Sequence, residues 1–239
     1  MIATITLTGA DERTSIDDLV NLLVDFPHLE IGLLYTANPE GRNRYPSLEW
    51  LHKAIDALQG GSAVHICGGS ARKQLLGGEL TRLLAPVSRI QVNGVITADE
   101  VKAASVAIEH PWHPQNRQVI TQHQIDNAYL STLSTFLTSD THALLVDGSG
   151  GRGLSPDKWI RPDSSKRIGF AGGLGPDNLA AELPKIAAIA SEHGRSWVDM
   201  EGRLRLGDWF DVGLARECAA VFHAFLRVDA PAPARRVRP

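Results

Sequence analysis

Short runs of consecutive apolar residues recur along the chain, and amphipathic segments separate most of them. Continuous apolar runs are typical of parallel strands buried on both faces, whereas a 3.6-residue period indicates helices. The runs predict eight strands, at residues 3–9, 30–36, 63–68, 89–94, 118–123, 142–148, 167–172 and 196–200. The intervening patterns predict helices at residues 15–24, 48–58, 98–108, 127–137, 176–190 and 208–225. After the third strand the helical pattern is interrupted by Gly77 and Gly78.

Strands that alternate with helices favour a parallel sheet joined by right-handed crossovers. Eight such units in 239 residues are typical of a closed barrel, since a (β/α)8 barrel takes about 250 residues. The sequence therefore predicts one α/β domain, a (β/α)8 TIM barrel over residues 1–227. Residues 228–239 are rich in Ala, Pro and Arg and lack an apolar period, which predicts a disordered tail.

The composition of the chain argues against several classes of binding partner and structural site. The net charge of −3 gives no broad basic surface, so nucleic acid is not favoured. Two cysteines, Cys67 and Cys218, are too few for a disulfide framework or a zinc cluster. The chain has no run of 18 apolar residues and no basic start typical of a signal peptide. We expect a cytoplasmic monomer or homodimer without a membrane partner, a metal or a cofactor.

Glycine-rich segments follow the sixth and seventh predicted strands, at residues 148–153 and 171–178. Glycine lets backbone N–H groups approach a phosphate, and a helix starting at Pro176 would add its positive dipole end. A single glycine-rich loop would be interpreted only as a tight turn, without a role in ligand binding. Two loops in these barrel positions favour phosphate binding, because barrels often hold phosphate with the loops after strands seven and eight.

These segments resemble the phosphoribosylanthranilate isomerase family of tryptophan biosynthesis. In that family the sixth strand ends Leu-Leu-Asp, followed by Gly-Gly-x-Gly and a Phe-Asp-Trp-like stretch, and residues 144–147, 150–153 and 157–159 are similar. The seventh strand ends Ala-Gly-Gly-Leu-x-Pro-x-Asn, which residues 171–178 match. The fourth-strand Gln-Leu-His-Gly and the second-loop Ser-Pro-Arg-Tyr of the family correspond to residues 91–94 and 43–45. The resemblance covers nearly the whole chain in order, and only the seventh-strand motif is specific by itself.

The resemblance implies an Amadori-type aldose–ketose isomerisation, which needs a general acid for the ring oxygen and a general base for a sugar carbon proton. It implies that Asp147 is the acid, that Arg44 binds the anthranilate carboxylate and that Asn93 lines the floor of the site. The alternatives are an aspartate that holds its own glycine turn and an arginine on the surface of a long loop. The residues implied to surround the phosphate are Gly151, Gly172, Gly173, Gly202 and Arg203.

Two strand ends depart from the family pattern. The family carries Lys-Ile-Cys-Gly in its first strand, with the cysteine as base, and Thr8 occupies that position here. A threonine hydroxyl is too weakly acidic to supply a base near neutral pH without an activator. After the eighth strand the family carries Asp-Val-Ser-Ser-Gly, whereas Glu201 here brings a negative charge towards the phosphate. Arg203 would offset this charge, unless Glu201 points outward.

Cys67 offers a possible replacement for the missing base. It ends the third strand, and odd-numbered strands contribute to the same interior layers, with His65 or His123 near the mouth. The alternative is a small buried cysteine.

Three functions therefore stay open: an isomerase acting on a small phosphorylated metabolite, a non-catalytic relative that kept the pocket as a sensor, and an enzyme acting on another small molecule through Cys67 or a histidine.

Overall fold

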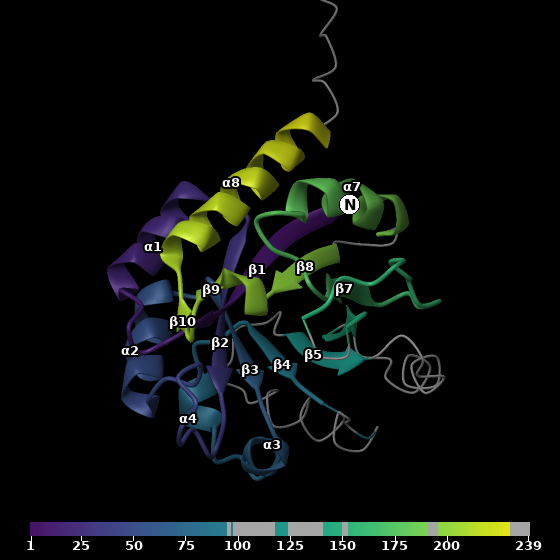
Figure 1. The fold of residues 1–239 in the computed structure, drawn as a ribbon. Helices are drawn as coiled ribbons and strands as arrows, with labels where there is room; N and C mark the ends of the chain where they lie inside the picture. The colour runs from purple at the N-terminus through teal and green to yellow at the C-terminus, as the bar shows by residue number, and fades with distance from the viewer. Residues whose placement is uncertain (95–96, 98–117, 124–140, 150–152, 191–195, 230–239) are drawn as a thin grey trace, which may run out of the picture.

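Eight parallel strands close into a barrel in chain order (Figure 1). The computed structural model describes residues 1–94, 97, 118–123, 141–149, 153–190 and 196–229 of the chain. The strands are β1 (Ile2–Ala10), β2 (Leu29–Tyr35), β3 (Ser62–Ile66), β4 (Arg89–Val92), β5 (Gln118–His123), β6 (His142–Asp147), β7 (Arg167–Ala171) and β8 (Ser196–Met200). All eight predicted strands are present, and the predicted (β/α)8 barrel is confirmed.

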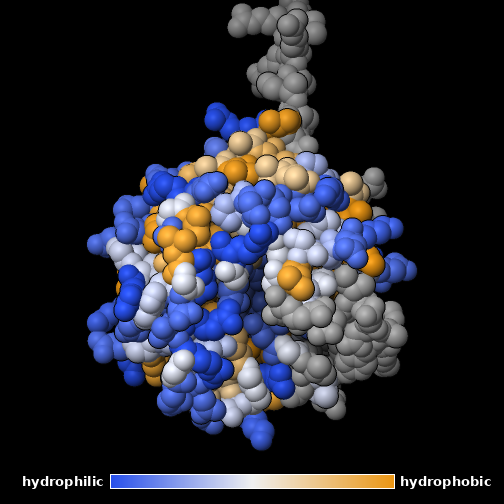
Figure 2. Space-filling view, viewed as in Figure 1, coloured by the Kyte–Doolittle hydropathy of each residue, from blue (hydrophilic) through white to orange (hydrophobic). Residues whose placement is uncertain are grey.

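Helices cover the outside of the strands (Figure 1). They are α1 (Ile16–Asp25), α2 (Leu48–Leu58), α3 (Gly69–Leu76), α4 (Thr81–Leu84), α7 (Leu179–Ile189) and α8 (Val212–Asp229). Helix α8 packs against α7 and α1, and α1 packs against α2. The Ser15 hydroxyl accepts the Asp18 N–H at 3.2 Å, as expected of an N-cap. Hydrophobic residues on the face seen in Figure 2 form only small, separated patches.

The helix predicted at residues 176–190 begins later than expected. Its N-cap is Asn178, and Pro176 lies before the helix. The Asn178 side chain explains the delay, because its Oδ1 accepts the Gly175 N–H and its Nδ2 donates to the Gly173 carbonyl. These bonds hold the preceding residues in a turn, so the helix dipole does not start at Pro176.

The helix predicted at residues 208–225 begins at Val212, because a short antiparallel hairpin precedes it. The hairpin pairs β9 (Arg205–Leu206) with β10 (Trp209–Phe210). The buried Asp11 carboxylate anchors it, accepting from Arg205 Nη2 and from the Phe210 N–H, both at 2.8 Å. Helix α8 extends through Asp229, two residues past the expected domain end.

The remaining helix predictions have mixed outcomes. The weak segment after β3 forms two short helices, and Gly78, at φ +77°, lies between them. The helices predicted at residues 98–108 and 127–137 lie outside the described residues, as do residues 230–239 of the predicted tail.

A buried ion pair occupies the barrel interior, where branched apolar residues usually predominate. Arg89 Nη1 lies 2.7 Å from Glu30 Oε1, and the Thr6 hydroxyl donates to the same oxygen at 2.9 Å. The Arg89 guanidinium also lies over the Trp197 ring, 4.4 Å from its centroid. Buried charges are tolerated when they are paired and hydrogen-bonded, and both conditions hold here. The sequence pattern did not reveal this pair.

Gly169 of β7 makes room for the Trp197 indole of β8, since a Cβ at Gly169 would lie 2.1 Å from the ring. We therefore expect Gly169→Ala to lower the free energy of unfolding by about 1–3 kcal/mol, the usual cost of overpacking. Urea unfolding measures the loss. Gly69→Ala is the matched control, because nothing lies within 4 Å of its added methyl group. An unchanged urea midpoint for Gly169→Ala would show that the indole does not fill this position.

Candidate active site at the carboxyl ends of the strands

A cavity of about 300 Å³ opens at the carboxyl ends of the strands, a size at the lower end of ligand pockets. It brings together predicted residues from five regions of the chain, namely Arg44, Asn93, Asp147, Gly172, Gly173, Gly202 and Arg203. Unpredicted polar residues also line it, namely Gln91, Gln122, Ser149 and Asp199. The predicted Gly151 lies outside the described residues.

Asp147 both lines the cavity and holds its own turn. Its Oδ1 accepts from the Ser149 N–H at 2.9 Å and from the Ser149 hydroxyl at 2.7 Å. Its Oδ2 accepts from Gln122 Nε2 at 2.8 Å. The side chain is 5% exposed. Both interpretations of Asp147 therefore apply, because its carboxylate holds the turn and also lines the cavity.

The turn after β7 forms part of the cavity wall through Gly172 and Gly173. Gly172 and Gly173 have φ angles of +123° and +59°, which L side chains rarely adopt. A Cβ at Gly173 would lie 2.1 Å from the Ser155 nitrogen, so the neighbouring segment also requires glycine there. Within the described residues, neither glycine N–H donates a hydrogen bond to the protein. These two amides are not consumed by their own turn.

Glu201 is paired with Arg44, not with Arg203. Arg44, from the loop after β2, forms an ion pair with Glu201, from the loop after β8, and both line the cavity. Arg203 instead donates to the Gly173 carbonyl at 3.1 Å and to Asp177 Oδ2 at 2.6 Å. The expectation that Arg203 offsets the negative charge of Glu201 is therefore wrong. Arg203 supports the turn after β7, and Arg44 neutralises Glu201.

Asp199 of β8 is a second buried carboxylate in the cavity wall. Its side chain is 5% exposed, and the Thr8 hydroxyl donates to its Oδ1 at 2.7 Å. The pKa of Asp199 is raised from 3.8 to about 6, chiefly by burial and to a smaller extent by the charge of nearby Asp147. Hydrogen bonds from Thr8 and Gln91 and the charge of Arg89 oppose this rise. Asp199 therefore changes its charge close to neutral pH. The feature of the sequence that could have identified Asp199 is the presence of an acidic residue within an otherwise apolar predicted strand.

Thr8 lies behind Asp199 and does not itself line the cavity. A Cβ at Gly32 of β2 would lie 2.1 Å from the Thr8 hydroxyl, so glycine there gives Thr8 its space. On the other side, Gln91 Nε2 lies 3.1 Å from His65 Nδ1 and donates to Asn93 Oδ1 at 3.0 Å. Burial lowers the pKa of His65 to about 4, so this histidine is neutral near pH 7. The floor of the cavity is a continuous polar network.

Cys67 lines a different cavity, together with Tyr45 and the first residues of α3. Asn93 Nδ2 lies 3.4 Å from its sulfur, and burial raises the pKa of the Cys67 thiol to about 11. A thiol with this pKa is protonated near neutral pH and is a poor base. The placement does not support the Cys67 alternative.

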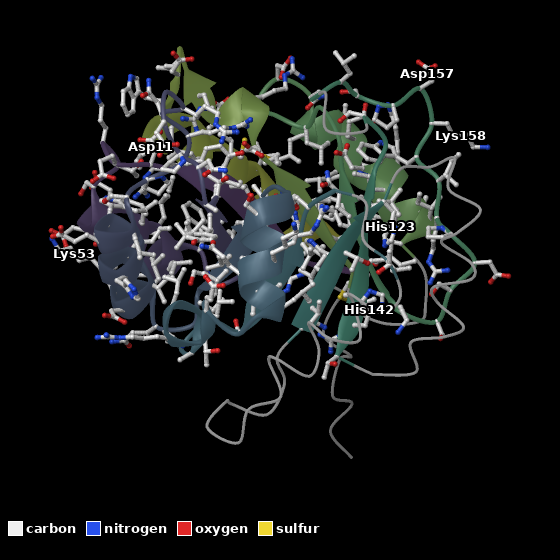
Figure 3. The ribbon with its side chains drawn as sticks, turned by 90° about the horizontal axis from the view of Figure 1, so that it is seen from below. Asp11, Lys53, His123, His142, Asp157 and Lys158 are labelled. Atoms are coloured by element: carbon white, nitrogen blue, oxygen red, sulfur yellow. The ribbon has the colours of Figure 1, made fainter. Side chains whose placement is uncertain are left out.

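Two histidines were suggested beside Cys67: His65 lines the first cavity, whereas His123 does not. His123 and His142 lie together at β5 and β6 (Figure 3), both within 3 Å of the Thr121 hydroxyl, at 2.5 and 2.9 Å from their Nε2 atoms. Neither lines the cavity. Asp157 and Lys158, part of the motif after the sixth strand, point outward at the edge of the molecule (Figure 3).

The structure is similar to several solved barrels. It superposes on phosphoribosyl anthranilate isomerase from Thermus thermophilus with a TM-score of 0.61 and 16% identity, covering 93% of this chain and 99% of that one. For the enzyme from Thermotoga maritima the TM-score is 0.64 and the identity 13%, over 94% of this chain and 100% of that one. The 3-hexulose-6-phosphate synthase from Salmonella typhimurium gives 0.53 and 14%, over 92% and 99%.

At these identities the likeness establishes the (β/α)8 fold. No family model matches the chain, and no curated protein does either.

No set of three or more His, Cys, Asp or Glu side chains in the described ranges is arranged to hold a metal ion. Among the helices described, none combines the length and apolar character needed to span a membrane.

Removing the Asp199 charge should stabilise the fold at neutral pH. Because the pKa of Asp199 rises from 3.8 to about 6 on folding, the folded state binds this proton more tightly, and stability falls as the pH rises through that window. We expect Asp199→Asn to increase the free energy of unfolding at pH 7 by up to about 3 kcal/mol, and to lose this advantage towards pH 4. Urea unfolding across this range measures it. A variant less stable than wild type at pH 7 would contradict the burial of a charged Asp199.

Proposed function

We propose that the protein is a phosphosugar isomerase of the phosphoribosylanthranilate isomerase type. The observation that supports this best is that one cavity is lined by two buried carboxyl groups, Asp147 and Asp199, and by Gly172 and Gly173, whose N–H groups have no hydrogen-bond acceptor among the described residues. An acid–base isomerisation of a phosphorylated sugar needs two proton-transfer groups and an anion site. The proposal includes a small phosphorylated metabolite as ligand and a cytoplasmic setting.

The phosphate would bind the amides after β7 and the loop after β8. Gly172, Gly173 and Gly202 line the same side of the cavity, with Arg203 bonded to the Gly173 carbonyl. Backbone N–H groups held in a turn form an anion-binding concavity. The glutamate that raised doubt at the sequence level is neutralised by Arg44, so it does not oppose an incoming phosphate with a free charge.

Arg44 would receive the aromatic carboxylate. Its side chain is partly exposed and already pairs with a carboxylate, that of Glu201, which supports this role. A guanidinium presents several donors, so it can bind a substrate carboxylate while it keeps its ion pair with Glu201.

The anion site is tested by adding a charge where there is room. Gly202 has open space around its Cβ position and needs no positive φ, so Gly202→Asp and Gly202→Asn should both fold. Because the two side chains differ only in charge, we expect Gly202→Asp to bind ribulose 5-phosphate at least about tenfold more weakly than Gly202→Asn. Isothermal titration calorimetry measures both. Equal affinities would place the phosphate elsewhere.

The reaction is tested by following N-(5′-phosphoribosyl)anthranilate with purified protein. We expect turnover by the wild type and a loss of about 100-fold or more in kcat for Asp147→Asn, which keeps the shape of the side chain but cannot give up a carboxyl proton. Calorimetry with ribulose 5-phosphate checks that the variant still binds. An inactive wild type that is folded and binds the phosphosugar would contradict the isomerase and support the second candidate.

That second candidate is a binding protein without catalysis. One observation favours it: three hydrogen bonds to Asp147 all donate to its carboxylate, an arrangement suited to holding a turn. Under this alternative Asp147→Asn would lower the stability of the fold and leave ligand affinity largely unchanged.

A further inference from the structure

The first strand of this chain lacks the cysteine that the resemblance would require, and Thr8 takes its place. We infer that Asp199 is the general base that takes the sugar carbon proton, and that Thr8 is its positioning residue. The inference rests on the isomerase function proposed above and names the second proton-transfer group of that site.

Strand register places Asp147 and Asp199 at the same level of the barrel wall, with one strand between them. Asp147 of β6 pairs with Ala171 of β7, and Ala171 pairs with Asp199 of β8. With one strand between them, their Cα atoms are about 10 Å apart, given the usual strand spacing. Ala171 also lines the cavity, and its small side chain leaves the space between the carboxyl groups open. A sugar carbon can therefore lie between an acid on one side and a base on the other.

The Asp199 carboxylate is held rigidly for this task. Thr8 has a single hydroxyl proton and donates it to Asp199 Oδ1 at 2.7 Å. Gly32 leaves room for the Thr8 side chain, which contacts Asp199 on the neighbouring strand β8. A hydroxyl donor stabilises the charged form of a carboxylate, so Thr8 keeps a desolvated base ionised instead of acting as one.

The proton transfer balances without any co-reactant. Once the sugar ring has opened to a C1=N iminium, the Asp199 carboxylate takes the proton from C2. The C2–H electron pair forms the C1=C2 bond, and the C1=N π pair moves to the nitrogen. Asp199 then gives its proton to C1, where the C1=C2 π pair forms the new C–H bond. The enol O–H proton passes to the Asp147 carboxylate, which had given its own proton to the ring oxygen, and this leaves a ketone at C2 and an amine on C1. The carboxyl group of Asp199 holds the transferred proton between the two steps.

The charged and polar groups around Asp199 come from six strands or from the loops that follow them. Asp147 of β6 raises its pKa, Arg89 of β4 lowers it, and Arg89 is itself paired with Glu30 of β2. Thr8 of β1 is uncharged, and His65 of β3 is neutral because burial lowers its pKa to about 4. Glu201, next to β8, is neutralised by Arg44. With a pKa of about 6, Asp199 is mostly ionised at pH 7 and close to the optimum for a general base.

The test compares Asp199→Asn with wild type in turnover of N-(5′-phosphoribosyl)anthranilate. Asparagine keeps an oxygen that accepts from Thr8 but cannot take a proton from carbon. We expect kcat to fall about 1000-fold, with KM within about threefold. Circular dichroism and thermal melting establish that the variant is folded. A folded Asp199→Asn variant that keeps more than a tenth of wild-type kcat overturns the inference and leaves the proposed function standing. An inactive wild type overturns both.

Thr8 is tested by the pH dependence of kcat/KM. We expect wild-type activity to fall on the acid side with an apparent pKa of about 6, because only the carboxylate accepts the proton. Thr8→Val has the same shape without the hydroxyl, so it should move this limb to higher pH by about one unit, whereas Thr8→Ser should leave it in place. A purely structural Thr8 would lower activity equally at every pH, and that result would overturn its positioning role. If Asp199→Asn fails to fold, these pH profiles still test the inference, because they use only the wild type and the Thr8 variants.

Discussion

The hydrogen bond from Thr8 to Asp199 is the interaction on which the organisation of this site depends. A carboxylate removed from water is unfavourable unless donors replace the lost hydration. Thr8 and Gln91 supply hydrogen bonds, and Arg89 supplies a positive charge from deeper in the barrel. Arg89 in turn is neutralised by Glu30 and lies over the Trp197 ring. The polar side chains inside the barrel are thus connected, and each buried charge among them is balanced by a neighbouring partner. This connected set ends with Asp199 at the cavity floor.

Small residues make this polar interior possible. Gly32 makes room for the Thr8 side chain, and Gly169 makes room for the indole that covers Arg89. At the mouth, Gly173 lets the segment that carries Ser155 pack closely, and its own N–H stays available. Each of these three glycines is required by a specific neighbouring side chain or segment. Each therefore has a role in packing, separate from any role in ligand binding.

Much of the fold could be predicted from local patterns, because each strand of the barrel is a short apolar run with its own signal. The start of α8 could not, since the hairpin before it depends on Asp11 binding Arg205 and Phe210 from the other end of the chain. For the same reason the sequence did not single out Asp199. Its burial and its bond to Thr8 join residues 191 positions apart.

The site was predicted in part. The strand-end motifs located Asp147 and the glycines after β7, which do line one cavity, together with Arg44 and Asn93. The partners of the charged residues were not predictable: Arg44 pairs with a glutamate 157 positions away, and Cys67 faces another cavity. Side-chain pairing across loops depends on how the barrel closes, which a single sequence does not specify.

The most direct measurement of the central claim is the titration of the Asp199 carboxyl carbon by ¹³C NMR, with its resonance assigned from its absence in Asp199→Asn. A buried carboxyl group facing Thr8 and the cavity should titrate with a pKa of about 6, well above the usual 3.8. A midpoint at or below 3.8 would show a solvated or fully ion-paired carboxylate and would contradict the role given to Asp199.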